Sequence, residues 1–532
     1  MDTAGLAIAV FDLVCKVAKK THEILCDYRN FDEESQELAR QVIEEHDRTR
    51  TLKCLLFEPA VAYNGQCLFM QFHHDIQRQI LFRQKEVFKI IEEAVELFEE
   101  QQLEATADLV SSVVRTELTP PTGTIIKRKS SPRIRLKWAL WEKKRLKSIV
   151  SSFTRSNDKV YVQVQLLCHA SSVGVDLKHL DRLANDEHSK KLGYDLPAQL
   201  HLTTTGMHAL NGSLEIKDET LFRNLAASNS VVDGISMVEL SGSMSVVEFR
   251  NYAPDRTEPV PIPERTRGRV ELLAHLLRQQ KDAAFRTLSC KGWSLDTRLN
   301  RVAFLFEIPD DMEGTPYSLL RLYESKKVRP ALGERLRLAK HLANSISGLQ
   351  LVEWVHESIR SENIVFFPRG PQNGETLSEE ERLVIAQPWV MGFEFSRPEL
   401  DFSSGRQDVN PARNVYRHPE RQNQPQKPFQ KIHDIYGLGV VLLEIGLWRS
   451  VLSLERAGFK NVTDPWTIQD YLVKKARKAL PREIGEKYAQ LVVRCLTGAF
   501  DVDKDSKNGL KLQQAFREQV VDVLEYAADS IG

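Results

Sequence analysis

The 532-residue sequence has little of what marks secreted, zinc-finger or nucleic-acid-binding proteins. It holds seven cysteines, an odd number, and none lies in a Cys-x-x-Cys pair or precedes a histidine at zinc-finger spacing. Its 73 Lys and Arg balance its 73 Asp and Glu, which excludes a uniformly basic nucleic-acid binder. We therefore expect reduced thiols, a cytoplasmic location, and no nucleic-acid partner.

Long apolar runs are missing as well. The apolar run at residues 4–14 is interrupted by Asp12 and is shorter than the roughly 20 residues that a membrane-spanning helix needs. No positively charged segment precedes it, which argues against a secretory signal. Because 532 residues exceed the usual size of one domain, the sequence predicts several domains.

The first 200 residues carry the apolar spacing of amphipathic helices. Residues 87–98 and 146–164 repeat apolar side chains at steps of three and four, as does the stretch from residue 5 to 55. Turn-like residues such as those at 119–123 separate these segments. The pattern predicts an all-α helical bundle over residues 1–200.

Charge within this region is segregated by sign. Residues 86–104 hold seven glutamates and one lysine, whereas residues 127–147 hold ten basic residues and one acidic residue. Two interpretations stay open, namely complementary solvated faces of one bundle and a basic patch for anionic lipid headgroups. The candidate lipid-binding residues are Lys127, Arg128, Lys129, Lys143, Lys144 and Arg145.

The pattern changes after residue 200. Residues 201–236 are rich in Ser, Thr, Asn and Gly and are expected to form a linker. Residues 237–330 contain short strand-like runs with one helical stretch at 270–281, and residues 331–532 are mostly helical. A small strand-rich lobe followed by a larger helical lobe is the order of the two-lobed α+β protein-kinase fold.

Residues 356–364 read His-Glu-Ser-Ile-Arg-Ser-Glu-Asn-Ile and resemble the kinase catalytic loop H-R-D-L-x-x-x-N. His356 and Asn363 keep their positions. Ser358 stands where the kinase Asp accepts the proton of the substrate hydroxyl, and a neutral hydroxyl cannot do this near pH 7. The resemblance implies a loop without its catalytic base.

Residues 390–397 resemble the segment around the kinase triplet D-F-G. The aligned residues are Gly392, Phe393 and Glu394, so the carboxylate that would hold magnesium at the nucleotide phosphates is missing. The resemblance implies a packing role for Phe393. Glu394, two residues late, is the alternative metal ligand.

Two further segments resemble kinase motifs with structural roles. Pro419 and Glu420 end a segment similar to A-P-E, although no arginine stands where the usual partner of this glutamate would be. Asp434 begins a segment that resembles the kinase helix whose leading Asp braces the catalytic-loop backbone. The resemblance implies that Asp434 has this bracing role.

The small lobe matches the kinase pattern less well. A phosphate-binding G-x-G-x-x-G does not occur, and residues 241–245 contain a single glycine. Arg250 stands roughly where V-A-I-K has its lysine, and Glu271 is its candidate ion-pair partner, although two ordinary surface charges fit the pattern equally well. We expect no metal and no cofactor, with ATP bound weakly if at all.

Three N-terminal segments, residues 2–9, 31–35 and 136–146, resemble the HeLo domain of fungal prion-inhibition and propagation proteins. That group also contains HeLo bundles joined to kinase-like domains. HeLo bundles are similar to the killer bundle of mixed-lineage kinase domain-like proteins, which breaches membranes. The first helix has two open interpretations, since its apolar stripe suits both a bundle core and a membrane-active helix.

Together the resemblances imply a non-catalytic pseudokinase coupled to a HeLo bundle in fungal heterokaryon incompatibility or programmed cell death. They imply protein partners, self-association through the bundle, and recruitment of a cytoplasmic protein to an anionic plasma membrane. The expected domains are residues 1–200, the linker 201–236, an N-lobe at 237–330 and a C-lobe at 331–532. An atypical active Ser/Thr kinase and an interaction scaffold without a membrane step are the alternatives.

Overall fold

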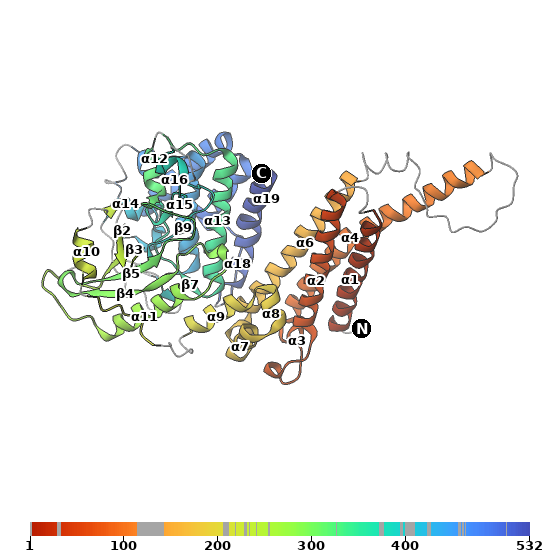
Figure 1. Cartoon of the computed structure of the whole chain (residues 1–532), viewed down its shortest axis with the longest axis horizontal. Coiled ribbons are helices and arrows are strands. Elements are labelled where there is room, and N and C mark those ends of the chain that lie inside the picture. The colour runs from red at the N-terminus through yellow and green to blue at the C-terminus, as the bar shows by residue number, and fades with distance from the viewer. Residues whose placement is uncertain are drawn as a thin grey trace. The chain divides into compact units, whose positions relative to one another are not determined.

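The computed structural model forms two compact units, Met1–Asp195 and Leu196–Gly532, whose boundary lies close to the predicted one (Figure 1). The described residues are 3–28, 33–113, 143–205, 212–218, 220–227, 231–232, 235–240, 242–253, 256–325, 327–371, 377–393, 397–398, 410–422, 427–455, 459, 462, 464–506 and 508–531.

The N-terminal unit is all-helical in its described part, as the sequence predicts. α1 packs against α2 and α4, and α6 packs against α4 and α2, so that the long helices lie side by side (Figure 1). Its α-helices are α1 (Thr3–Tyr28), α2 (Glu33–Phe57), α3 (Leu68–Gln71), α4 (His74–Val113), α6 (Lys143–Ala170), α7 (Leu177–Asn185) and α8 (Glu187–Leu192).

The first helix is part of the core of this unit. Ala7, Phe11, Val14 and Ala18 recur at steps of three and four and are fully buried, because this spacing places them on the face of α1 that packs against its neighbours. Asp12, which interrupts the apolar run, lies off that face and forms an ion pair with Lys53 of α2. The structure therefore shows the core interpretation of α1.

The C-terminal unit opens with a five-stranded antiparallel sheet in the order β1-β2-β3-β5-β4. Helix α11 (Glu264–Arg278) lies between β3 and β4 in the chain and packs against β4. The predicted runs at 237–240, 245–249 and 302–306 lie within three of these strands. The strands are β1 (Val231–Val232), β2 (Ile235–Leu240), β3 (Ser243–Asn251), β4 (Cys290–Asp296) and β5 (Arg301–Glu307).

The remainder of this unit is mainly helical, with two small antiparallel sheets of order β10-β7 and β6-β8-β9. Its α-helices are α12 (Leu319–Glu324), α13 (Leu332–Leu351), α14 (Pro411–Asn414), α15 (Lys431–Leu447), α16 (Pro465–Glu483), α17 (Glu486–Thr497), α18 (Leu510–Phe516) and α19 (Asp522–Ile531). Its strands are β6 (Tyr317–Ser318), β7 (Trp354–Val355), β8 (Ile364–Phe366), β9 (Trp389–Val390) and β10 (Arg397–Pro398).

Helix α15 lies at the centre of this helical region and is buried along almost its whole length. Its two glycines allow close packing. A Cβ atom at Gly439 would lie 2.7 Å from Cβ of Cys495 on α17, and one at Gly437 would lie 3.0 Å from the carbonyl oxygen of Ile359. The glycines therefore let α17 and the 356–364 loop approach the α15 backbone.

Part of the segment expected to be a linker, 201–236, is folded within the C-terminal unit. It contains the end of α9 (Asp195–Thr204), α10 (Leu221–Ala227), β1 and the start of β2. The backbone of Trp293 in β4 accepts from the N–H of Ile216 at 2.7 Å and donates to the carbonyl of Leu214 at 3.0 Å. These bonds to the free edge of β4 order a polar segment that has no apolar periodicity to reveal it.

The chain thus consists of an all-α unit followed by an α+β unit with small antiparallel sheets. Across the described residues, every helix is too short or too polar to cross a membrane.

Candidate functional site

The loop between β7 and β8 carries three of the predicted site residues, and Asp434 in the first turn of α15 holds its backbone. The Asp434 carboxylate accepts the N–H of His356 at 2.7 Å and the N–H of Glu357 at 2.9 Å. Glu357 has a left-handed backbone with φ of 63°. Two charge-assisted bonds hold the loop at this turn, which is the contact that the sequence predicts for Asp434.

His356 is a packing residue in this loop. Its ring is fully buried and lies 4.7 Å from the ring of Phe393, measured between centroids. Nδ1 accepts the N–H of Ser358 at 3.2 Å. Burial, assisted by the nearby Arg360 charge, lowers the pKa of His356 to about 3, so the imidazole is neutral at physiological pH. Phe393 is likewise buried, in agreement with its predicted packing role.

The side chain of Asn363 closes onto Ser358. Its Nδ2 donates to the Ser358 carbonyl at 2.7 Å and to Oγ at 3.0 Å. Arg360 also donates to this Oγ through Nη1, and its Nε donates to Glu362 at 2.9 Å. The Ser358 hydroxyl oxygen therefore accepts hydrogen bonds from the Asn363 amide and from the Arg360 guanidinium. Neither donor makes the hydroxyl a stronger base.

Gly392 approaches the loop so closely that only glycine fits. Its φ is 86°, and a Cβ atom there would lie 2.0 Å from Nδ2 of Asn363. Its N–H donates to Oε2 of Glu248 at 2.9 Å. The Asn363 amide thus occupies the volume that any side chain at position 392 would need. Glu394 lies outside the described residues.

Glu248 is a site residue that the sequence analysis did not identify. It lies on β3, two residues before Arg250 on the same face of the strand, and its side chain is buried. The register of β3 against β5 brings Glu248, opposite Phe304, within reach of Gly392. The β3 group that contacts Gly392 is therefore the acid Glu248, and the sequence analysis made no prediction for it.

Glu271 on α11 has partners other than Arg250. Its carboxylate accepts from the Ser213 hydroxyl at 3.0 Å, from the Leu214 N–H, and from Nε1 of Trp293 at 2.8 Å. Ser213 and Leu214 belong to the segment that pairs with the edge of β4, and Trp293 belongs to β4 itself. These three donors thus engage the Glu271 carboxylate in this structure.

Glu420 also has a partner that the sequence did not predict. Pro419 begins the short 3-10 helix Pro419–Arg421, and Oε1 of Glu420 accepts from Nζ of Lys427 at 2.6 Å. This hydrogen bond lowers the pKa of Glu420. Lys427 thus supplies the cation whose usual arginine is missing from the sequence.

A second buried acid, Glu444 on α15, contacts the 356–364 loop through Ser361. It accepts from Ser361 Oγ at 2.6 Å, from the Tyr416 hydroxyl at 2.7 Å and from the Val451 N–H at 2.8 Å. Burial raises the pKa of Glu444 to about 7 even though these three donors favour the ionised form. The sequence signal for it is a single acid inside an apolar helix.

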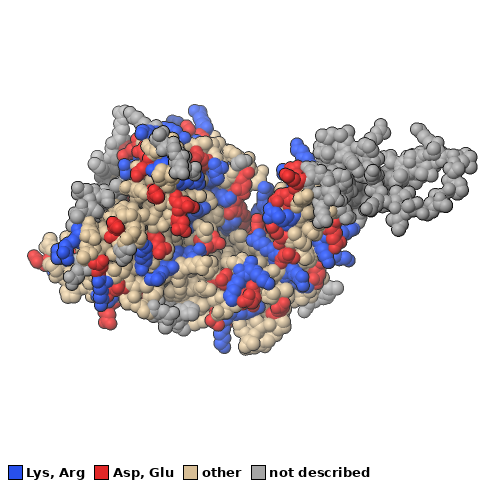
Figure 2. All heavy atoms as spheres, in the orientation of Figure 1, with Lys and Arg blue, Asp and Glu red and all other residues tan. Residues whose placement is uncertain are grey.

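Of the candidate lipid-binding residues, Lys127, Arg128 and Lys129 lie outside the described residues, and so does the side chain of Lys143, the first residue of α6. Lys144 and Arg145 are exposed. The face drawn in Figure 2 shows basic and acidic side chains interspersed over the described surface.

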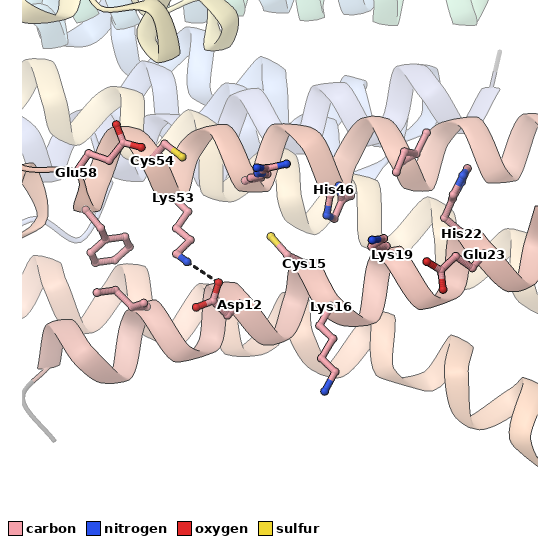
Figure 3. A pocket seen from close by; sticks show the side chains of 14 residues that line it. Asp12, Cys15, Lys16, Lys19, His22, Glu23, His46, Lys53, Cys54 and Glu58 are labelled. Atoms are coloured by element: carbon pink, nitrogen blue, oxygen red, sulfur yellow. Dashed lines mark hydrogen bonds and ion pairs between the residues drawn. The ribbon is translucent and has the colours of Figure 1, made fainter.

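A groove of about 900 Å³ lies between α1 and α2 in the N-terminal unit (Figure 3). Figure 3 shows the Asp12–Lys53 ion pair across it, with Cys54 and Glu58 next to each other at one end. The groove was not predicted, because its lining comes from the half-exposed flanks of two helices. Its lining residues are Ile8, Asp12, Cys15, Lys16, Lys19, His22, Glu23, Ile43, His46, Arg50, Lys53, Cys54, Phe57 and Glu58.

Comparison with known proteins gives one family. A family model described as "Domain of unknown function (DUF7580)" matches residues 255–531, which is just over half of the chain. No curated protein matches the chain.

Proposed function

The chain belongs to the DUF7580 family, and we propose that its C-terminal unit is a kinase-like domain that transfers no phosphoryl group and regulates the helical N-terminal unit. The description of the family states no activity. The proposal rests on the geometry around Gly392 and Asp434.

The kinase-like part of the proposal is supported by the order of the elements and by one contact. An antiparallel sheet with a helix between its third and fourth strands precedes a helical region, and Asp434 braces the 356–364 loop from α15. The sequence resemblance implies this combination for a protein kinase. The family match begins after β3, so it covers β4 and β5 of the sheet together with α11 and the whole helical region.

One observation carries the non-catalytic part, namely the closure of Asn363 onto Ser358 beneath Gly392. A phosphoryl-transferring site needs a base at the position of Ser358 and a metal-binding carboxylate at the position of Gly392. Here Gly392 supplies no carboxylate, and the Asn363 amide fills the space beside it, since a Cβ at Gly392 would lie 2.0 Å from Asn363 Nδ2. Beside this point the only described acid in contact with Gly392 is Glu248, whose buried Oε2 accepts the Gly392 N–H instead of facing a nucleotide-bound metal.

Thermal unfolding with ATP, with and without magnesium, tests this. We expect a shift below about 1 °C in both cases, because the groups that would hold magnesium and phosphate are missing. The Asn363→Ala variant, measured alongside, separates binding at this site from binding elsewhere. A rise of several degrees that needs magnesium and is lost in Asn363→Ala would contradict the proposal and favour an atypical active kinase.

We infer further that the N-terminal unit is a HeLo-like effector that reaches anionic membranes after release. The start of α6 exposes Lys144 and Arg145, which suit anionic headgroups. The apolar face of α1 is buried in the core, so lipid can contact it only after α1 leaves the bundle. We therefore propose a cytoplasmic protein in which the kinase-like unit controls the N-terminal unit. It would act in a cell-death or incompatibility response, bind protein partners and self-associate.

A further inference from the structure

Three metal-ligating side chains of the N-terminal unit meet where α2 ends. Cys54 lies in the last turn of α2, and Glu58 follows one turn later on the same face. His188 comes from α8, which packs against α2. Nε2 of His188 lies 3.3 Å from Oε2 of Glu58, and the thiol, carboxylate and imidazole ligand atoms all lie within 4.8 Å of one another.

The three groups are chemically suited to zinc. Thiolate sulfur, imidazole nitrogen and carboxylate oxygen are its usual protein ligands, and three of them leave a fourth position for water. The site is accessible, because the His188 side chain is 29% exposed and that of Glu58 is 56% exposed.

The tautomer required of His188 is available. A metal at Nε2 requires the proton of the neutral ring to be on Nδ1. Among the described residues, none forms a hydrogen bond with Nδ1 of His188, so nothing opposes this tautomer. The present contact with Glu58 would be replaced by a shared metal ion.

A second cluster, formed by His418, Glu420 and His433, lacks this freedom. Nδ1 of His418 accepts the backbone N–H of Glu420 at 3.2 Å, and Nδ1 of His433 accepts that of Gln430 at 3.0 Å. Each neutral ring therefore carries its proton on Nε2, the atom that would have to bind a metal. Glu420 is also engaged by Lys427.

We propose that Cys54, Glu58 and His188 bind one divalent transition-metal ion of the zinc class, with water as the fourth ligand. The Cys54 thiol gives its proton to solvent on binding, and Glu58 and His188 bind as carboxylate and neutral imidazole. The ion ties the end of α2 to α8. All three ligands belong to the N-terminal unit, so the site uses no residue of the kinase-like unit.

Titration of the untagged full chain with Co²⁺ tests the site. We expect one equivalent to bind with a near-ultraviolet sulfur-to-cobalt charge-transfer band that Zn²⁺ abolishes by displacement. Cys54→Ala and His188→Gln should each remove the band. Cys26→Ala is the matched control, since Cys26 is half-buried and its Sγ lies 3.3 Å from Nε2 of His22.

The variant Glu58→Gln keeps the folded shape and tests the third ligand, in case Cys54→Ala fails to fold. It should weaken Co²⁺ binding at least tenfold while retaining the sulfur band at high Co²⁺. The proposal is overturned if the wild-type chain gives no sulfur-to-cobalt band, if the band persists in folded Cys54→Ala, if it is lost in Cys26→Ala, or if Glu58→Gln binds like wild type.

Discussion

The carboxylate of Asp434 accepts the backbone N–H of His356 at 2.7 Å, so α15 holds the backbone at the start of the 356–364 loop. The same carboxylate accepts the N–H of Glu357. Because both contacts are to backbone groups, they persist whatever side chains the loop carries. The loop can therefore lose its catalytic base and keep its conformation.

Asp434→Ala should destabilise the C-terminal unit although Asp434 occupies no catalytic or metal-binding position. The buried N–H of His356 would lose its acceptor at a cost of about 1–3 kcal/mol, and the part-buried N–H of Glu357 would lose its acceptor at a smaller cost. Chemical denaturation monitored by tryptophan fluorescence measures the loss, with the exposed Asp503→Ala as the control for removing one aspartate from the same unit. Equal midpoints for the two variants would show that Asp434 does not brace the loop.

Gly392→Ala should destabilise more than Gly485→Ala. Both glycines lie in the C-terminal unit with positive φ, 86° and 106°, and no atom lies within 4 Å of a Cβ at Gly485. Gly485→Ala therefore measures backbone strain alone, about 1–3 kcal/mol, because φ of 106° and ψ of 158° lie in a region that essentially only glycine adopts. Gly392→Ala adds the collision with Asn363, a further cost of about 1–3 kcal/mol.

The double variant Gly392→Ala with Asn363→Ala checks the cause of this difference. Removing the Asn363 amide should recover most of the extra loss, because the added methyl group then has space. If the double variant is no more stable than Gly392→Ala, the amide does not fill this volume.

Glu444→Gln should become relatively more stable as the pH rises. The pKa of Glu444 is about 7 in the folded chain against an ordinary value of 4.5, so between these values the folded state holds a proton that the unfolded state has lost. Stability from this group therefore falls as the pH rises through that window, and the loss is complete above pH 7.

Glutamine does not titrate, so the stability of Glu444→Gln minus that of wild type should rise by up to about 3 kcal/mol from pH 4.5 to 7.5. Denaturant midpoints across this range measure it, with the exposed Glu483→Gln as control for the loss of one negative charge. A difference that stays constant or falls with pH would show that Glu444 is ionised throughout.

Residues 1–195 should bind anionic vesicles in a salt-sensitive way, and the full chain should bind them less. Charge attraction decays over about 8 Å at physiological salt, so raising the ionic strength should release the initial attachment. Reversing the charges of Lys143, Lys144 and Arg145 should reduce binding, whereas reversing those of Lys190 and Lys191 on α8 should not. No binding at low salt would favour the interaction scaffold.

The helices were predictable from the sequence because their burial follows a local period. Buried residues of α1 recur every three or four positions, and the strands β3 and β5 contain short runs of apolar residues, Val246–Val247 and Val302–Phe306. β4 was missed, because its Cys-Lys-Gly-Trp-Ser-Leu-Asp sequence has a central glycine and no clear alternation. Gly292 is needed there, since a Cβ would lie 2.4 Å from the Leu214 carbonyl.

The site residues were predictable only where they belong to segments that resemble kinase motifs. His356, Ser358, Asn363 and Asp434 follow a known spacing, and the structure brings them together. Glu248 depends on the register of β3 and on a contact across 144 residues, which no local pattern encodes. The meeting of Cys54 with His188 depends in the same way on helix packing.

Phosphoryl transfer by the full chain is the most direct test of the central claim that the C-terminal unit is non-catalytic. Radiolabelled ATP would be incubated with the chain, magnesium or manganese, and a generic protein substrate. We predict incorporation, including autophosphorylation, no greater than in a blank without protein, for wild type and Asn363→Ala alike. Reproducible incorporation above the blank that Asn363→Ala abolishes would contradict the account.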